Sequence, residues 1–348
     1  MHSKIISSFA ILLASSSTYA TDTKQPLSEL LEQINRGERT HYEAPKYPLI
    51  AAKKGQEGWV VVSYVIGKDG NVNSAFVQDS SIPQVFDQAT LTAVKAWTFE
   101  PTLVNGEAIE QCKNSVRMDF VIGQGEKGAR RKFVSRYNKI TTALDEGDLG
   151  LAGKLIDKLR VKGSWNLYED AWLSNIEARY YRQQGDVDSE MRSLSRLSST
   201  RRPLLALGEH LNSLARLFTL KVNHKQFISA FQIALTIQRL DTENLLYPRI
   251  RAVTERIEQY IDGKDNYMVN GTLNDKGIWR YQLARNSFGF SGDISSINKL
   301  DVRCENKHLT YSVTKDTAWN IPDSYGQCSI YVFGRKQSKV ELVELAKS

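Results

Sequence analysis

Turn-like residue pairs recur at a fixed interval through the middle of the chain. Gly147-Asp148, Gly185-Asp186 and Asn223-His224 are spaced 38 residues apart. Apolar residues at helical spacing flank these pairs. Paired helices that repeat at a period of about 34–40 residues indicate a short helical solenoid, because one helical hairpin cannot bury its own apolar face. Residues 127–263 are therefore predicted to form a helical-repeat domain of about three units.

The segment before the repeats, residues 41–125, has a mixed strand and helix pattern. Trp59–Ile66 is rich in β-branched and aromatic residues, Gly67–Gly70 suits a hairpin turn, and Asn71–Asp79 returns as a second strand. Ser81 is expected to cap a helix that covers the sheet, and Asn114–Ile122 is expected to be the third strand. The expected apolar face of that helix comprises Phe86, Ala89, Ala93, Val94 and Trp97.

The segment after the repeats, residues 265–348, alternates apolar and polar residues in short runs broken by glycines. This pattern favours a small antiparallel sandwich or barrel. The expected fold class is therefore α+β multidomain. A three-stranded antiparallel sheet with a packed helix comes first, an all-α repeat domain follows, and a small β domain ends the chain.

The N-terminus has the features of a secretory signal. Lys4 is the positive n-region, Ile5–Ala14 is a short apolar core, and Thr18-Tyr19-Ala20 offers small residues to a signal peptidase. Residues 1–20 are predicted to be a cleaved signal peptide, which favours a periplasmic location. An uncleaved anchor, with the protein on the periplasmic side of the inner membrane, is the alternative. Residues 21–40 are expected to be a short lead that contains an amphipathic helix.

Export changes the interpretation of charge and of cysteines. The formal net charge of +7 favours acidic partners or anionic surfaces and not nucleic acid, because an exported protein rarely meets nucleic acid. Cys304 and Cys328 lie 24 residues apart in one strand-rich segment and are predicted to form a disulfide. Cys112 is then left over, and a partly buried thiol is the expected state.

No pattern in the sequence indicates catalysis. The histidines are not spaced as in HExxH, no CxxC occurs, and GxSxG and Walker loops are missing. We therefore expect a protein that is not an enzyme and that has no metal site and no cofactor.

Residues 41–125 resemble the C-terminal domain of TonB, the energy-transducing protein of the Gram-negative envelope. In that family a three-stranded antiparallel sheet carries one packed helix, and the third strand binds the short "TonB box" peptide of outer-membrane receptors by strand addition. The resemblance covers about 80 residues, a quarter of the chain. It rests on Pro45-Lys46-Tyr47-Pro48, Ala51, Glu57-Gly58, Val60-Val61-Val62, Asp69-Gly70, Ser80, Phe86-Asp87, Ala89, Ala93-Val94, Trp97-Thr98-Phe99-Glu100-Pro101 and Val116–Phe120.

The resemblance implies a peptide-binding edge. An exposed edge strand offers unpaired N–H and C=O groups to a visiting strand. Arg117 and Asp119 are expected to tune the choice of peptide, and replacement of Met118 by proline is expected to remove one edge donor. The Tyr47-Pro48 turn is expected near the end of the docked strand, with a purely core and turn role as the alternative. The implied edge comprises Ser115, Val116, Arg117, Met118, Asp119 and Phe120.

The chain also departs from the family pattern. The family's transducers carry a membrane anchor and a long proline-rich spacer, whereas the eight prolines here are scattered and further domains follow the TonB-like segment. The repeats look like a degenerate tetratricopeptide array that holds a second protein. We expect a periplasmic accessory of TonB-dependent transport that binds an outer-membrane receptor or another envelope transport protein, with the inner-membrane energising complex as an indirect partner. The alternatives are an envelope assembly scaffold with no part in uptake and an anchored, short-spacer energy transducer.

Overall fold

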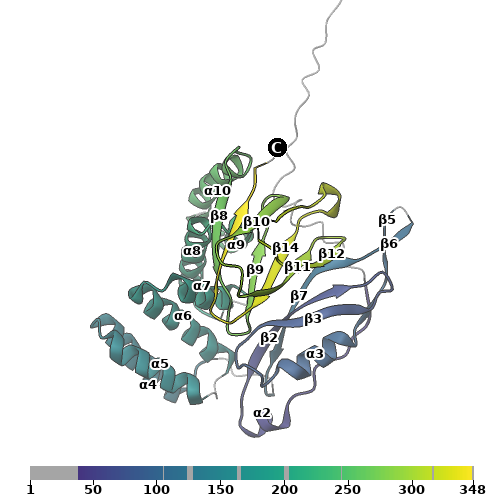
Figure 1. Cartoon of the computed structure of the whole chain (residues 1–348). Helices are drawn as coiled ribbons and strands as arrows, with labels where there is room; N and C mark the ends of the chain where they lie inside the picture. The colour runs from purple at the N-terminus through teal and green to yellow at the C-terminus, as the bar shows by residue number, and fades with distance from the viewer. Residues whose placement is uncertain are drawn as a thin grey trace, which may run out of the picture. The chain divides into compact units, whose positions relative to one another are not determined.

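A computed structural model describes residues 38–104, 106–123, 128–162, 166–199, 204–243, 245–315 and 317–346 (Figure 1). Residues 34–348 belong to one compact unit, so the predicted domains pack against one another. The predicted signal peptide and the amphipathic helix of the lead lie outside the described residues. Within the described ranges, no helix is both long enough and apolar enough to cross a bilayer.

The first part of the unit is a three-stranded antiparallel sheet in the order β3-β2-β7, with helix α3 on one face (Figure 1). Arg39 and Thr40, expected to belong to the lead, instead form strand β1 together with His41, and this strand pairs with β4. The elements are β1 (Arg39–His41), α2 (Leu49–Lys53), β2 (Gly58–Ile66), β3 (Val72–Ser80), α3 (Asp87–Lys95), β4 (Thr98–Phe99), β5 (Thr102–Val104), β6 (Glu107–Ile109) and β7 (Gln111–Phe120).

Helix α3 begins at Asp87, six residues later than the predicted cap at Ser81. Ser81 instead extends the sheet: its Oγ accepts a hydrogen bond from the backbone N–H of Trp59 at 2.9 Å. Gln84 has a φ of 68°, in the left-handed region, which no helix can include. The predicted face of the helix is correct, because Phe86, Val94 and Trp97 belong to the core of the sheet and Ala89 packs against it.

Three helical hairpins and one further helix follow. The turns predicted at 38-residue spacing separate α4 from α5, α6 from α7, and α8 from α9. Gly185 has a φ of 74°, which explains the glycine at that helix end. The relation to tetratricopeptide repeats stays a prediction. The helices are α4 (Arg131–Asp145), α5 (Leu149–Lys162), α6 (Leu167–Gln184), α7 (Val187–Ser198), α8 (Leu207–Asn223), α9 (Phe227–Leu240) and α10 (Tyr247–Ile261).

The last part contains two four-stranded antiparallel sheets, ordered β13-β10-β15-β8 and β12-β11-β14-β9. A disulfide joins Cys304, just after β11, to Cys328, just before β14. The elements are β8 (Tyr267–Thr272), β9 (Ile278–Gln282), β10 (Ser287–Ser291), β11 (Ile297–Arg303), β12 (His308–Tyr311), β13 (Ala318–Asn320), the 3-10 helix η1 (Asp323–Tyr325), β14 (Ser329–Gly334) and β15 (Lys339–Glu344).

Both faces of the β3-β2-β7 sheet are covered. Helix α3 covers the first face, and the β domain contacts the second, where Phe76 lies edge-on to Tyr331 and Phe333. Arg303 of β11 is fully buried and donates from Nη1 to Ser63 Oγ at 3.1 Å. The helical part also contacts the second face. The β3-β2-β7 sheet is therefore an internal layer of the compact unit.

Candidate functional site

Strand β7 pairs with β2 on one side only, so its other side is an edge of the sheet. The direction of its backbone groups follows from β2. Trp59 directs both its N–H and its C=O toward Ser81, on the β3 side. Because successive residues of a strand alternate, Val60 and Val62 direct their backbone groups toward β7. Their partners in register are Met118 and Val116.

The outward-facing backbone groups of β7 therefore belong to Ser115, Arg117 and Asp119. In the described parts of the chain, no hydrogen bond from another segment reaches the backbone of these three residues. The expectation for Met118 was wrong: its N–H faces β2, so a proline there would break the sheet and not the edge. The open edge offers three N–H donors and three C=O acceptors to an added strand.

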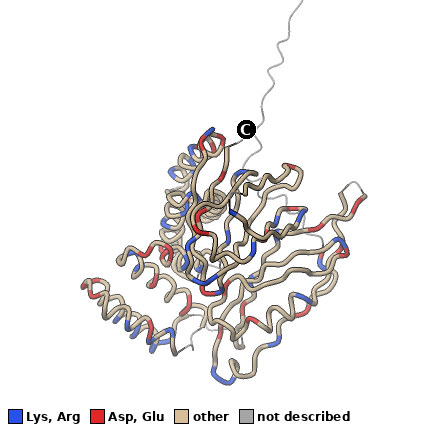
Figure 2. Tube along the Cα trace, viewed as in Figure 1, with Lys and Arg blue, Asp and Glu red and all other residues tan. Residues whose placement is uncertain are grey.

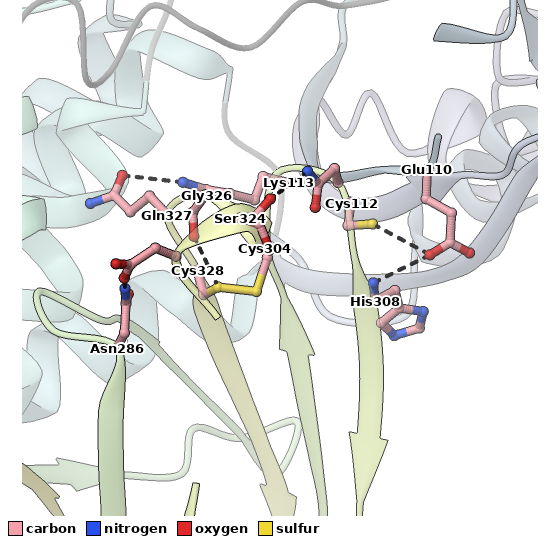
Figure 3. The surroundings of a disulfide bond; sticks show 12 residues. Glu110, Cys112, Lys113, Asn286, Cys304, His308, Ser324, Gly326, Gln327 and Cys328 are labelled. Atoms are coloured by element: carbon pink, nitrogen blue, oxygen red, sulfur yellow. Dashed lines mark hydrogen bonds between the residues drawn. A yellow bond between two sulfur atoms is a disulfide. The ribbon is translucent and has the colours of Figure 1, made fainter. Parts of the chain in front are cut away.

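The start of the same edge is already covered by the chain itself. The N–H of Cys112 donates to the carbonyl of Glu305 at 3.3 Å, and Lys113 Nζ donates to Gln327 Oε1 at 3.2 Å. Figure 3 shows Cys112 and Lys113 beside the Cys304–Cys328 disulfide. The loop that the disulfide holds thus closes the first residues of β7, and the edge opens from Ser115 onward.

Arg117 is fixed by internal contacts. Its side chain is 7% exposed, and its guanidinium lies 4.4 Å from the ring of Trp59. It also donates to Asp119 at 2.8 Å. A further hydrogen bond of 2.8 Å joins Arg117 Nη1 to Ser199 Oγ, at the end of α7. Arg117 therefore holds the edge strand to the helices, whereas Ser115 and Asp119 are exposed.

The remaining predicted site residues lie on the other face. Val116 and Met118 pack against the core, and Phe120 is buried in it. Tyr47 contacts the ring of Phe120, the last residue of β7, at 5.6 Å, and its hydroxyl donates to the carbonyl of Gln56. Pro48 precedes α2 and accepts a hydrogen bond from the N–H of Ala52 at 3.0 Å. The expected continuation of β7 to Ile122 is wrong, because Ile122 is 43% exposed and lies beyond the strand.

Sequence reasoning missed the residues that attach this sheet to the helices. Trp59 is 1% exposed and donates from Nε1 to Asp170 of α6 at 2.7 Å. Glu57 accepts from the N–H groups of Ile122 at 2.9 Å and Leu167 at 3.4 Å. One signal was present: the run Trp59–Ile66 is apolar almost throughout, which is typical of a strand buried on both faces.

Cys112 is the one free thiol among the described residues, and it is fully buried. Burial raises its pKa to about 12, and the neighbouring carboxylate of Glu110 adds to the rise. A thiol in that state is a poor nucleophile. Within the described ranges, no group of three or more His, Cys, Asp or Glu residues is arranged to hold a metal ion.

Comparison with known proteins identifies the segment that contains this edge. Residues 43–122 match the family of the Gram-negative bacterial TonB protein C-terminal. The matched segment thus includes β2, β3, α3 and β7, and it ends two residues after the edge strand. The match covers the edge from Ser115 to Phe120 and the turn at Tyr47 and Pro48.

Several curated relatives carry the TonB name. Protein tonB2 of Pseudomonas aeruginosa is 38% identical over 80 residues, which are 23% of this chain and 29% of the relative. Protein TonB of Vibrio cholerae is 37% identical over 62 residues, which are 18% of this chain and 25% of the relative. The chain therefore spans less than a third of the length of these relatives.

Among solved structures, the solution NMR structure of Pseudomonas aeruginosa TonB CTD is 26% identical to the matched part. It covers 26% of this chain and 92% of that chain, with a TM-score of 0.24.

Proposed function

We propose that this protein is a TonB-like interaction module of the Gram-negative envelope that binds an extended peptide by strand addition at β7. Its role would lie in TonB-dependent transport, with an outer-membrane receptor or another envelope transport protein as the peptide donor. The observation that carries the proposal is the open edge formed by the backbones of Ser115, Arg117 and Asp119, in a domain that matches the TonB C-terminal family.

Physical chemistry favours this use of the edge. Unpaired backbone groups at a sheet edge bind a strand through main-chain hydrogen bonds, which are indifferent to sequence. Specificity must then come from side chains beside the edge. Asp119 is exposed there, while Arg117 is held by Trp59 and Ser199, so we expect Asp119 to have the larger influence on peptide choice.

We propose an accessory role and not an enzymatic one for the whole chain. The helical hairpins would hold a second protein, and a periplasmic location follows if residues 1–20 are removed as a signal. An inner-membrane energising complex would be reached only through other proteins.

An assembly scaffold is the second candidate. The coverage of the second sheet face by α6, α7 and the β domain favours it, because the domain is built into a larger unit. A scaffold would not need the edge groups of β7, so an experiment on that edge separates the two functions.

The test uses the full chain, labelled with ¹⁵N, and synthetic peptides from the N-terminal segments of outer-membrane receptors. Strand addition should shift the amide signals of Ser115, Arg117 and Asp119 and slow their hydrogen exchange. The amides of Val116 and Met118 should change little in exchange, because β2 already binds them.

Ser115→Pro removes one outward donor without touching the β2–β7 ladder. We expect peptide affinity to fall at least about tenfold, from the lost hydrogen bond and the clash of the proline ring with the docked strand. Ser115→Ala is the matched control, because it removes the same hydroxyl and keeps the N–H. Equal peptide affinity in the proline and alanine variants would exclude strand addition at this edge.

A further inference from the structure

A cavity of about 420 Å³ lies between the second face of the TonB-like sheet, helices α7 to α9 and strand β9. Three cationic side chains line it: Arg196 of α7, Lys221 of α8 and Arg280 of β9. A neighbouring cavity of about 550 Å³ includes these three side chains in a lining of mixed charge. Cavities of this size accommodate small ligands.

Positive charge in the first cavity is not balanced. Asp79 is the only acidic residue among its described lining residues, and an ion pair of 3.1 Å already joins it to Arg196. Lys221 Nζ donates to the neutral Oε1 of Gln226 at 2.7 Å. Within the described residues, no carboxylate lies within ion-pair distance of Lys221 or Arg280. Elsewhere, acidic and basic residues are interspersed (Figure 2).

Arg280 also has an unused donor. Its Nε is buried and has no hydrogen-bond partner among the described residues. The guanidinium lies 5.9 Å from the ring of Tyr331. A buried polar group without a partner costs free energy unless a ligand or a water satisfies it. Arg280 therefore has the chemistry of a ligand-binding group and not of a structural one.

The environment of Lys221 agrees with this interpretation. Burial, together with the positive charge of Arg280, lowers the pKa of Lys221 to about 8, and Asp188 opposes that effect only in part. The two cations therefore repel each other. An anion between them would relieve that repulsion.

We propose that this cavity binds an oxyanion, a carboxylate or a phosphate, between Lys221 and Arg280. Arginine guanidinium groups match the planar edge of a carboxylate or phosphate with two parallel hydrogen bonds. Gln226 and Gln282 add neutral amide donors to the same lining. Because Ser115 of the open β7 edge also lines the cavity, the oxyanion has two possible sources: a free anion or an acidic side chain of a docked strand.

The test is isothermal titration of the full chain with inorganic phosphate, with succinate and with a receptor peptide that contains an acidic residue, all at constant ionic strength. At least one of these should bind saturably, and Arg280→Gln should weaken that binding at least about tenfold. Arg280→Lys should retain part of it. Arg251→Gln, on the exposed face of α10, is the charge-matched control and should change nothing.

The three titrations distinguish a free anion from an acidic side chain of a docked strand. Binding of phosphate or succinate that persists in Ser115→Pro identifies a free anion and holds whether or not strand addition occurs. A requirement for the acidic peptide, lost when its acid is replaced by the amide, identifies a docked strand. If Arg280→Gln does not fold, Lys221→Gln gives the same test. The absence of saturable binding in all three titrations, or equal binding by Arg280→Gln and the native chain, overturns the proposal.

Discussion

Replacement of Arg303 by methionine tests how the β domain is fastened to the TonB-like sheet. The Arg303 side chain is fully buried and donates three hydrogen bonds: to Asp301 Oδ1 at 2.8 Å, to Ser63 Oγ at 3.1 Å and to the carbonyl of Ser74 at 2.6 Å. Two of the three reach the other domain. The guanidinium also lies 4.6 Å from the ring of Phe76.

The magnitude follows from these contacts. Removal of one partner of a buried ion pair costs about 3–5 kcal/mol, because the other charge is left uncompensated. Asp301 keeps His308 at 3.1 Å and Lys299 at 3.3 Å, which limits the loss. Methionine also fills part of the vacated volume. We expect the free energy of unfolding to fall by about 3 kcal/mol.

Urea unfolding followed by circular dichroism measures the global loss, and hydrogen exchange of β3 reports whether the interface at Ser74 loosens first. Arg335→Met is the control, because Arg335 is exposed in the same domain and its replacement should cost less than about 0.5 kcal/mol. A loss below about 1 kcal/mol in Arg303→Met, with unchanged exchange in β3, would refute the role assigned to Arg303.

Two further predictions concern titration and thiol chemistry. Hydrogen bonds from His308 and Arg303 hold the pKa of Asp301 at about 2, despite burial. A depressed carboxyl pKa stabilises the fold above the unfolded value near 4, and that contribution is lost as the pH falls toward 2; Asp301→Asn should therefore flatten the acid limb of the stability curve, and an unchanged acid limb would contradict this assignment. The raised pKa of Cys112 and its burial predict negligible alkylation by iodoacetamide at pH 8 until urea unfolds the chain; rapid alkylation of the native chain would show that the start of β7 opens readily.

Local sequence patterns predicted local structure well. The Gly67–Gly70 turn lies between β2 and β3, and the three turns spaced 38 residues apart lie between helices, because turn residues act within a few positions. The start of α3 was misplaced for an instructive reason. Ser81 has a side chain suited to a helix cap, but its hydroxyl oxygen instead accepts a hydrogen bond from the backbone N–H of Trp59, 22 residues away.

The candidate site was predictable only in part. Family resemblance indicated the edge residues of β7, but which backbones face outward depends on the pairing of Trp59 with Ser81. The cationic cavity depends on Arg196, Lys221 and Arg280, which come from three separate elements. No spacing rule joins such residues, because only tertiary packing brings them together.

The hydrogen bond between Cys112 and Glu305 at the start of β7 limits the length of peptide that could pair with this edge. Because the carbonyl of Glu305 occupies the edge at Cys112, only the five residues from Ser115 to Asp119 are available, about 17 Å of strand. A docked peptide that extended further toward Cys112 would collide with the loop held by the disulfide. The fold of this protein, and not the docked peptide, would therefore set how many peptide residues pair with β7.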